Sequence, residues 1–87
     1  MMRIVYVNLP TVEHVQKFVE QISPLDGNFD LLSGGYVLDA KSLMSVLSLD
    51  LSTPLILSVE KDTEAAMNAI SSFITEAPAR DTEPASR

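Results

Sequence analysis

Few side chains of this 87-residue chain could take part in bond-making chemistry. The chain holds a single histidine, His14, and no cysteine. An imidazole is a good nucleophile near neutral pH, so His14 is the residue whose group-transfer chemistry must be considered. A structural zinc site is implausible with one histidine and no thiolate, and we expect no metal and no other cofactor.

Ser42 is the second residue of interest, because the sequence changes its period there. Residues 36–40 alternate like a strand, whereas Leu43, Val46 and Leu47 come at helical spacing. A serine at such a junction stands where a helix N-cap belongs, and its hydroxyl can accept a hydrogen bond from an unpaired backbone N–H of the first turn. The sequence therefore predicts a strand, a cap and a short helix in direct succession.

The composition indicates one small folded domain and excludes several classes of function. Hydrophobic residues make up 46% of the chain, which is normal for a globular protein. The net charge is −6 and the basic residues are scattered, which argues against binding to nucleic acid or to an anionic membrane. No apolar run could cross a bilayer and no signal-type segment precedes the first strand, so we expect a cytoplasmic protein.

Hydrophobic periodicity predicts four strands and three helices. The strands are expected at residues 2–8, 29–33, 36–40 and 55–60. The helices are expected after Thr11, after Ser42, and after Asp62 or Thr63, because these residues can cap a helix. The apolar stripes of the first and last helices are expected to be buried, and they consist of Val12, Val15, Phe18, Val19 and Ile22, and of Ala66, Ala69, Ile70, Phe73 and Ile74.

The order β-α-β-β-α-β-α predicts an α/β protein of the α+β type, with a four-stranded antiparallel sheet and three helices on one face. Gly34-Gly35 predicts a tight hairpin, because the favoured two-residue turn needs positive φ at both positions. We expect residues 1–76 to form the domain. Residues 77–87 carry no large apolar side chain and are expected to be a disordered tail.

One face of this sheet is expected to be uncovered. If alternate strand residues such as Leu31 and Leu57 face the helices, then Leu32, Val37 and Ile56 face outward. A contiguous apolar patch suggests association, so the sequence leaves open a weak homodimer through this face.

The stretch that contains Ser42 resembles a segment of the histidine-containing phosphocarrier (HPr) family of the sugar phosphotransferase system. Residues 40–49 read AKSLMSVLSL, and the family segment reads roughly AKSIMGVMSL. The resemblance covers the element order over about residues 2–75 and implies the open-faced β-sandwich of that family. It also implies that Ser42 is a candidate regulatory phosphoserine. The apolar residues that follow are implied to dock protein partners, among them phosphotransferase-system components, and they are Leu43, Met44 and Leu47.

The family's active site is where this chain departs from the resemblance. In the family, a histidine at the start of the first helix takes a phosphoryl group from enzyme I and passes it to a sugar-specific acceptor. The motif there reads roughly Gly-Leu-His-Ala-Arg-Pro-Ala. Alignment from Ser42 without gaps puts Thr11 at the place of the phosphohistidine and Glu13 at the place of the arginine. His14 falls where the family has proline, and the Glu13 carboxylate would repel a phosphoryl group.

Two functions of different classes therefore stay open. The first is a non-phosphorylating interaction or regulatory protein, which keeps the scaffold and the docking helix and has no catalytic residue. The second is a working phosphocarrier that accepts a phosphoryl group from enzyme I on His14 in a shifted geometry. The residues favour the first. The alternative fold is a different β-α-β-β-α-β domain, of ferredoxin or small-molecule-sensing type.

Overall fold

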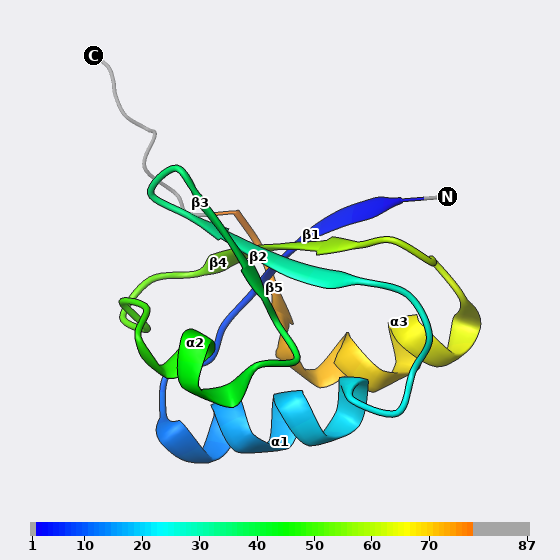
Figure 1. Cartoon of the computed structure of the whole chain (residues 1–87), viewed down its shortest axis with the longest axis horizontal. Coiled ribbons are helices and arrows are strands. Elements are labelled where there is room, and N and C mark those ends of the chain that lie inside the picture. The colour runs from blue at the N-terminus through cyan, green and yellow to red at the C-terminus, as the bar shows by residue number, and fades with distance from the viewer. Residues whose placement is uncertain (1, 78–87) are drawn as a thin grey trace.

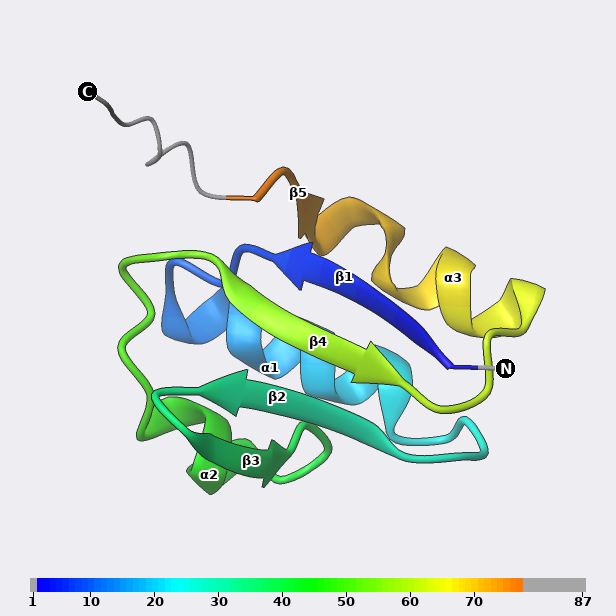
Figure 2. The ribbon, with the colours of Figure 1, turned by 90° about the horizontal axis from the view of Figure 1, so that it is seen from above.

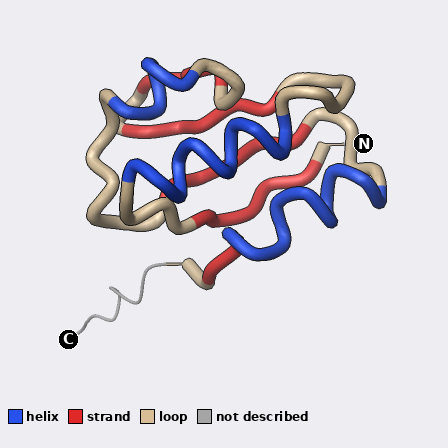
Figure 3. Tube along the Cα trace, turned by 90° about the horizontal axis from the view of Figure 1, so that it is seen from below, coloured by secondary structure: helices blue, strands red, loops and turns tan. Residues whose placement is uncertain are grey.

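An antiparallel sheet covered by three helices makes up the α+β fold of this chain (Figure 1). The computed structural model describes residues 2–77, so the predicted tail, apart from Ala77, lies outside the described residues. Figure 3 shows the three helices on one side of the strands. In chain order the elements are β1 (Arg3–Val7), α1 (Val12–Ile22), β2 (Phe29–Ser33), β3 (Tyr36–Asp39), α2 (Leu43–Leu47), β4 (Leu55–Val59), α3 (Glu64–Ile70), the 3-10 turn η1 (Ser71–Phe73) and β5 (Ile74–Thr75).

The sheet has five strands in the order β3-β2-β4-β1-β5, not the four that the sequence predicts (Figure 2). The last predicted helix was expected to include Ile74, but α3 ends at Ile70 and the chain continues through η1 into β5. Residues Ile74 and Thr75 are β-branched and pair with the otherwise free edge of β1. That pairing satisfies backbone groups that a longer helix would have left exposed on β1.

The two-glycine hairpin between β2 and β3 is confirmed. Gly34 has φ of +55° and Gly35 has φ of +88°, and Ser33 pairs directly with Tyr36 across the turn. This register places Leu31 opposite Leu38. The turn therefore determines which side chains of β3 face the helices and which face outward.

Strand residues divide between a buried face and an open face, as their alternation predicts. The inward positions of the central strands are fully or almost fully buried under the helices, and they are Val7, Phe29, Leu31, Leu55, Leu57 and Val59. Leu32, Val37 and Ile56 lie on the other face, in direct register with one another. That prediction is also confirmed.

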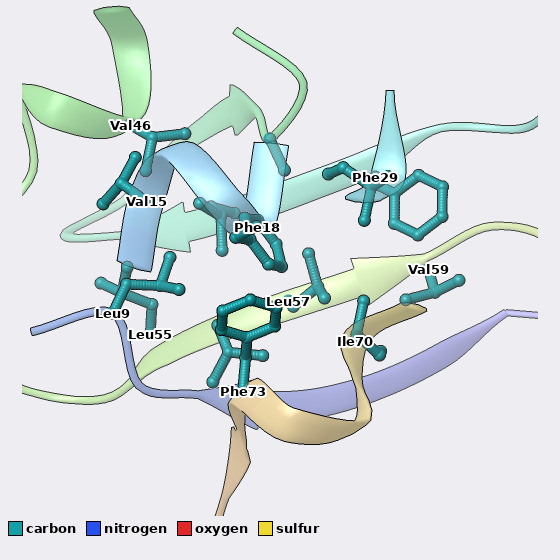
Figure 4. Packing of buried hydrophobic residues seen from close by; sticks show 14 of the residues in the cluster. Leu9, Val15, Phe18, Phe29, Val46, Leu55, Leu57, Val59, Ile70 and Phe73 are labelled. Carbon is teal, nitrogen blue, oxygen red and sulfur yellow. The ribbon is translucent and has the colours of Figure 1, made fainter. Parts of the chain in front are cut away.

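Phe18 of α1 is at the centre of the core (Figure 4). Its ring meets the ring of Phe73 edge to face, with 5.4 Å between the centroids. The predicted stripe of α1 is wrong at Val12, which is 53% exposed. At about 100° per residue, Val12 lies about 90° around the helix from the centre of the buried set, beyond the edge of the contact with the sheet.

The predicted stripe of the last helix is wrong at Ile74, which is 40% exposed. Ile74 belongs to β5, at the margin of the sheet, and not to the face of α3 that packs on the core. Ala66, Ile70 and Phe73 are buried as predicted.

We expect the two turn glycines to differ in their tolerance of side chains. Apart from the glycine itself and its two chain neighbours, no described atom lies within 4 Å of a Cβ built at either position, so backbone conformation determines the cost of a side chain there. Gly34→Asn should change the free energy of unfolding by less than about 0.5 kcal/mol, because asparagine adopts this left-handed turn position readily. Gly35→Val should lower it by about 1–2 kcal/mol, because a β-branched residue is strained at positive φ. Urea unfolding of both variants measures the difference, and equal stabilities would contradict it.

Candidate functional site

The helix α2 packs against the N-terminal half of α1 through its buried valine. Figure 4 shows Val46 of α2 next to Val15 of α1, and both side chains are fully buried. Figure 1 shows α2 beside the beginning of α1. Thr11 and His14 lie at the start of α1, whereas Lys41, the residue before Ser42, donates from Nζ to the carbonyl of Leu25, beyond the other end of α1.

Thr11 and His14 are in direct contact. Thr11 is the N-cap of α1, and its Oγ1 accepts a hydrogen bond from the backbone N–H of His14 at 3.2 Å. The same oxygen lies 2.6 Å from Nδ1 of the His14 ring. This arrangement resembles a capping box, in which the third helical residue reaches back to the cap. Sequence reasoning treated the two residues separately, although their spacing of three at a helix start is the signal that predicts such a contact.

The contact allows two states of the imidazole, and they differ in chemistry. In one, the Thr11 hydroxyl donates to Nδ1 and Nε2 carries the ring proton, so no nitrogen lone pair is free. In the other, Nδ1 carries the proton and donates to Oγ1, and Nε2 presents a free lone pair. His14 is exposed on the helix surface, so Nε2 is accessible in the second state.

Glu13 lies between these two residues and is exposed in the first turn of α1. A carboxylate there is favourable for the helix, since it faces the positive end of the helix dipole. The same charge opposes a phosphate group. Arg3, the one arginine among residues 2–77, is paired with Asp62, whose carboxylate oxygen lies 2.9 Å from Nε. No arginine of the described chain therefore accompanies Thr11.

Ser42 occupies the N-cap position of α2 but does not cap it with its side chain. Its carbonyl accepts from the backbone N–H of Val46 at 3.1 Å, whereas its hydroxyl bonds to the hydroxyl oxygen of Ser45 at 3.1 Å. The predicted side-chain cap bond is wrong, because the hydroxyl of Ser42 is turned toward Ser45 Oγ, to which it donates, and accepts from no helix N–H. Ser42 is half-buried, and its phosphorylation stays a prediction.

Met44 is the predicted docking residue that projects from α2 without cover. It is 76% exposed, whereas Leu43 and Leu47 are partly buried against the core. A flexible, exposed methionine suits a surface that adapts to a partner. Docking through the three residues stays a prediction.

An acidic turn follows α2. Asp50 accepts hydrogen bonds from the hydroxyl of Ser52 at 2.6 Å and from its backbone N–H at 3.0 Å. These two bonds, chiefly the hydroxyl one, lower the pKa of Asp50 below its usual value. The loop after α2 therefore stays negatively charged through the mildly acidic range.

No group of three or more acidic or histidine side chains within residues 2–77 is arranged to hold a metal ion. None of the helices in that part of the chain has the length and apolar character needed to span a bilayer.

Comparison with known proteins finds no match: no family model, no curated protein and no solved structure resembles this chain sufficiently to be matched.

The corrected capping pattern predicts that Thr11 and Ser42 contribute differently to stability. Thr11→Ala should lower the free energy of unfolding by about 1 kcal/mol, because it removes the acceptor for a helix N–H. Ser42→Ala should change it by less than about 0.5 kcal/mol, because no helix N–H depends on its hydroxyl. Chemical unfolding of both variants and of Thr11→Ser, which keeps the acceptor, provides the comparison. A loss for Ser42→Ala as large as that for Thr11→Ala would contradict the assigned bonds.

Proposed function

We propose that this chain is an HPr-like interaction protein that binds a protein partner and carries no phosphoryl group. The observation that carries the proposal is the first turn of α1, where Thr11 and Glu13 stand in place of the histidine and arginine of the HPr motif. The sheet order β3-β2-β4-β1 with helices on one side supports the finer assignment of the fold as an open-faced sandwich. β5 is an addition to that plan.

The chemistry of Thr11 argues against a carrier function at this position. A phosphoryl group on a threonine oxygen is a stable ester, whereas a carrier needs the more reactive bond to an imidazole nitrogen. Glu13 adds a negative charge beside the place where the phosphoryl charge would develop. A site that neither holds nor releases the group fits a scaffold retained for binding.

The proposed docking surface is the exposed side of α2 with Met44 at its centre. Leu43 and Leu47 are partly buried, so they position the helix and contribute their outer atoms to the surface. Phosphorylation of Ser42, at the start of α2, would regulate this surface, since added charge there would lie beside the apolar contact.

A second candidate function is a phosphocarrier that uses His14, and the contact with Thr11 favours it. Thr11 Oγ1 lies 2.6 Å from Nδ1 of His14, and this contact fixes the orientation of the ring. When Nδ1 carries the proton, Nε2 is free to attack a phosphoryl group. In this route the phosphoryl group passes from a phosphorylated donor protein to Nε2, and the donor's nitrogen leaves with the electron pair of the broken bond.

Incubation with phosphoenolpyruvate and enzyme I from the same organism should leave the intact mass of this chain unchanged. The expectation follows from the replacement of both active-site residues by Thr11 and Glu13. An ordinary HPr protein serves as the positive control. A gain of one acid-labile phosphoryl group that is lost in His14→Ala would establish the carrier function instead.

We expect Met44→Lys to weaken binding to enzyme I, measured by titration calorimetry without phosphoenolpyruvate, by about tenfold or more, as loss of a central apolar contact does. Val37→Lys is the matched control, because it adds the same charge at a residue 65% exposed on the far side of the sheet. Equal weakening by both variants would show that charge, and not the α2 surface, determines the affinity. Undiminished binding of Met44→Lys would show that Met44 and its helix α2 are not part of the interface with enzyme I.

A further inference from the structure

The face of the sheet that points away from the helices carries a continuous apolar row. Cross-strand pairing aligns Val37 with Leu32, Leu32 with Ile56, and Ile56 with Tyr6, across β3, β2, β4 and β1. At about 4.8 Å between strands, the row is about 14 Å long. None of the helices within residues 2–77 covers this face (Figure 2). Val37 remains 65% exposed, and the other three are partly exposed.

A row with a different character runs beside it. Asp39 pairs with Asp30, Asp30 with Ser58, and Ser58 with Ile4. Two carboxylates therefore stand directly opposite each other on adjacent strands, an arrangement that lowers the stability of a sheet. The backbone N–H of Lys41 donates to Asp39 Oδ1 at 2.9 Å, but neither carboxylate forms an ion pair with a described residue.

All charged side chains at the outward strand positions of this face are negative. The outward positions of the five strands include two carboxylates and no lysine or arginine, and they are Ile4, Tyr6, Asp30, Leu32, Val37, Asp39, Ile56, Ser58 and Thr75. The chain as a whole has a net charge of −6. A second copy placed against this face would add two more carboxylates and no lysine or arginine from its strands, so charge does not favour the homodimer that the apolar row alone would suggest.

We propose that the open face of the sheet binds an amphipathic helix of a partner protein, with an apolar stripe flanked on one side by lysine or arginine. A stripe about ten residues long matches the 14 Å apolar row. The adjacent acidic row lies about 7 Å away, two residues along the strands, where the basic flank of such a helix would meet Asp30 and Asp39. Partner cations would relieve the repulsion between the two carboxylates.

This surface is independent of the proposed function, because it lies on the opposite side of the sheet from α2. The proposed function and the proposed binding of a helix to the open face can therefore be tested and rejected separately. Met44→Lys tests the surface on α2, and substitutions of Asp30 and Asp39 test the open face.

The test is a titration followed by NMR, with a synthetic helical peptide of leucine, lysine and alanine as the probe. The peptide is about 18 residues long, because shorter helices are marginal in water. Its leucines form one stripe and its lysines one flank, and a second peptide carries glutamate in place of lysine. The lysine peptide should shift the signals of Ile4, Leu32, Val37 and Ile56, and the glutamate peptide should shift none of them.

Charge variants of the protein decide whether the site is specific. The double variant Asp30→Asn with Asp39→Asn should weaken binding of the lysine peptide about fivefold or more. This is the combined effect expected when two ion pairs at the surface are lost. The asparagines keep an acceptor for the Lys41 N–H and remove a repulsion, so this variant should fold. Glu13→Gln with Glu20→Gln is the matched control, because it makes the same change in net charge on α1, and it should leave the affinity unchanged.

Four results would overturn the proposal. Equal weakening by the two double variants, or signal shifts centred on α1 and α2, would mean attraction by net charge alone. Failure of the lysine peptide to bind the protein would show that the open face does not bind a basic amphipathic helix. Open-face signals that move with protein concentration alone, together with a dimer in sedimentation, would identify a second copy as the occupant.

Discussion

The fold depends on burial of one face of the sheet, and the contact between Phe18 and Phe73 is central to it. Their edge-to-face packing, with 83° between the ring planes, is of a kind worth about 0.5–1.5 kcal/mol beyond the buried area. Because Phe73 lies in η1, the contact joins the end of the described chain to α1. The carbonyl of Phe73 accepts from the backbone N–H of Asn8 at 2.8 Å, which directs the following residues along β1. The fifth strand is thus a consequence of this packing.

One-sided burial leaves two separate surfaces on a small molecule. The first surface is on the short helix α2 of the helical layer. This helix buries Val46 in the core and presents Met44 to solvent. The open face keeps apolar side chains in register because the strands need β-branched and large residues on both faces to pair well. Neither surface depends on the other, because they lie on opposite sides of the sheet.

The strands and the hairpin could be predicted from the sequence, because local patterns determine them. The end of α3 and the bond of the Ser42 hydroxyl could not, because alternative partners compete for the same groups. Alternation located the strands, and Gly34-Gly35 located the hairpin, because period and positive φ are local properties. The helix end at Ile70 was missed because Ile74 continues the helical spacing, while its actual partner, β1, lies at the far end of the sequence. Ser42 was placed correctly, but its choice between a backbone N–H and the Ser45 hydroxyl involves about 1 kcal/mol or less, which residue type does not decide.

The same competition operates at the start of α1, where it bears on function. Thr11 Oγ1 has two lone pairs and one proton, and the backbone N–H of His14 uses one lone pair. The remaining lone pair and the proton are the two ways in which the hydroxyl can meet Nδ1. Donation by the hydroxyl stabilises the cap and leaves the imidazole without a free lone pair, whereas acceptance frees Nε2. The proton between these two atoms therefore separates a structural histidine from a nucleophilic one, and no change of fold is needed to pass from one to the other.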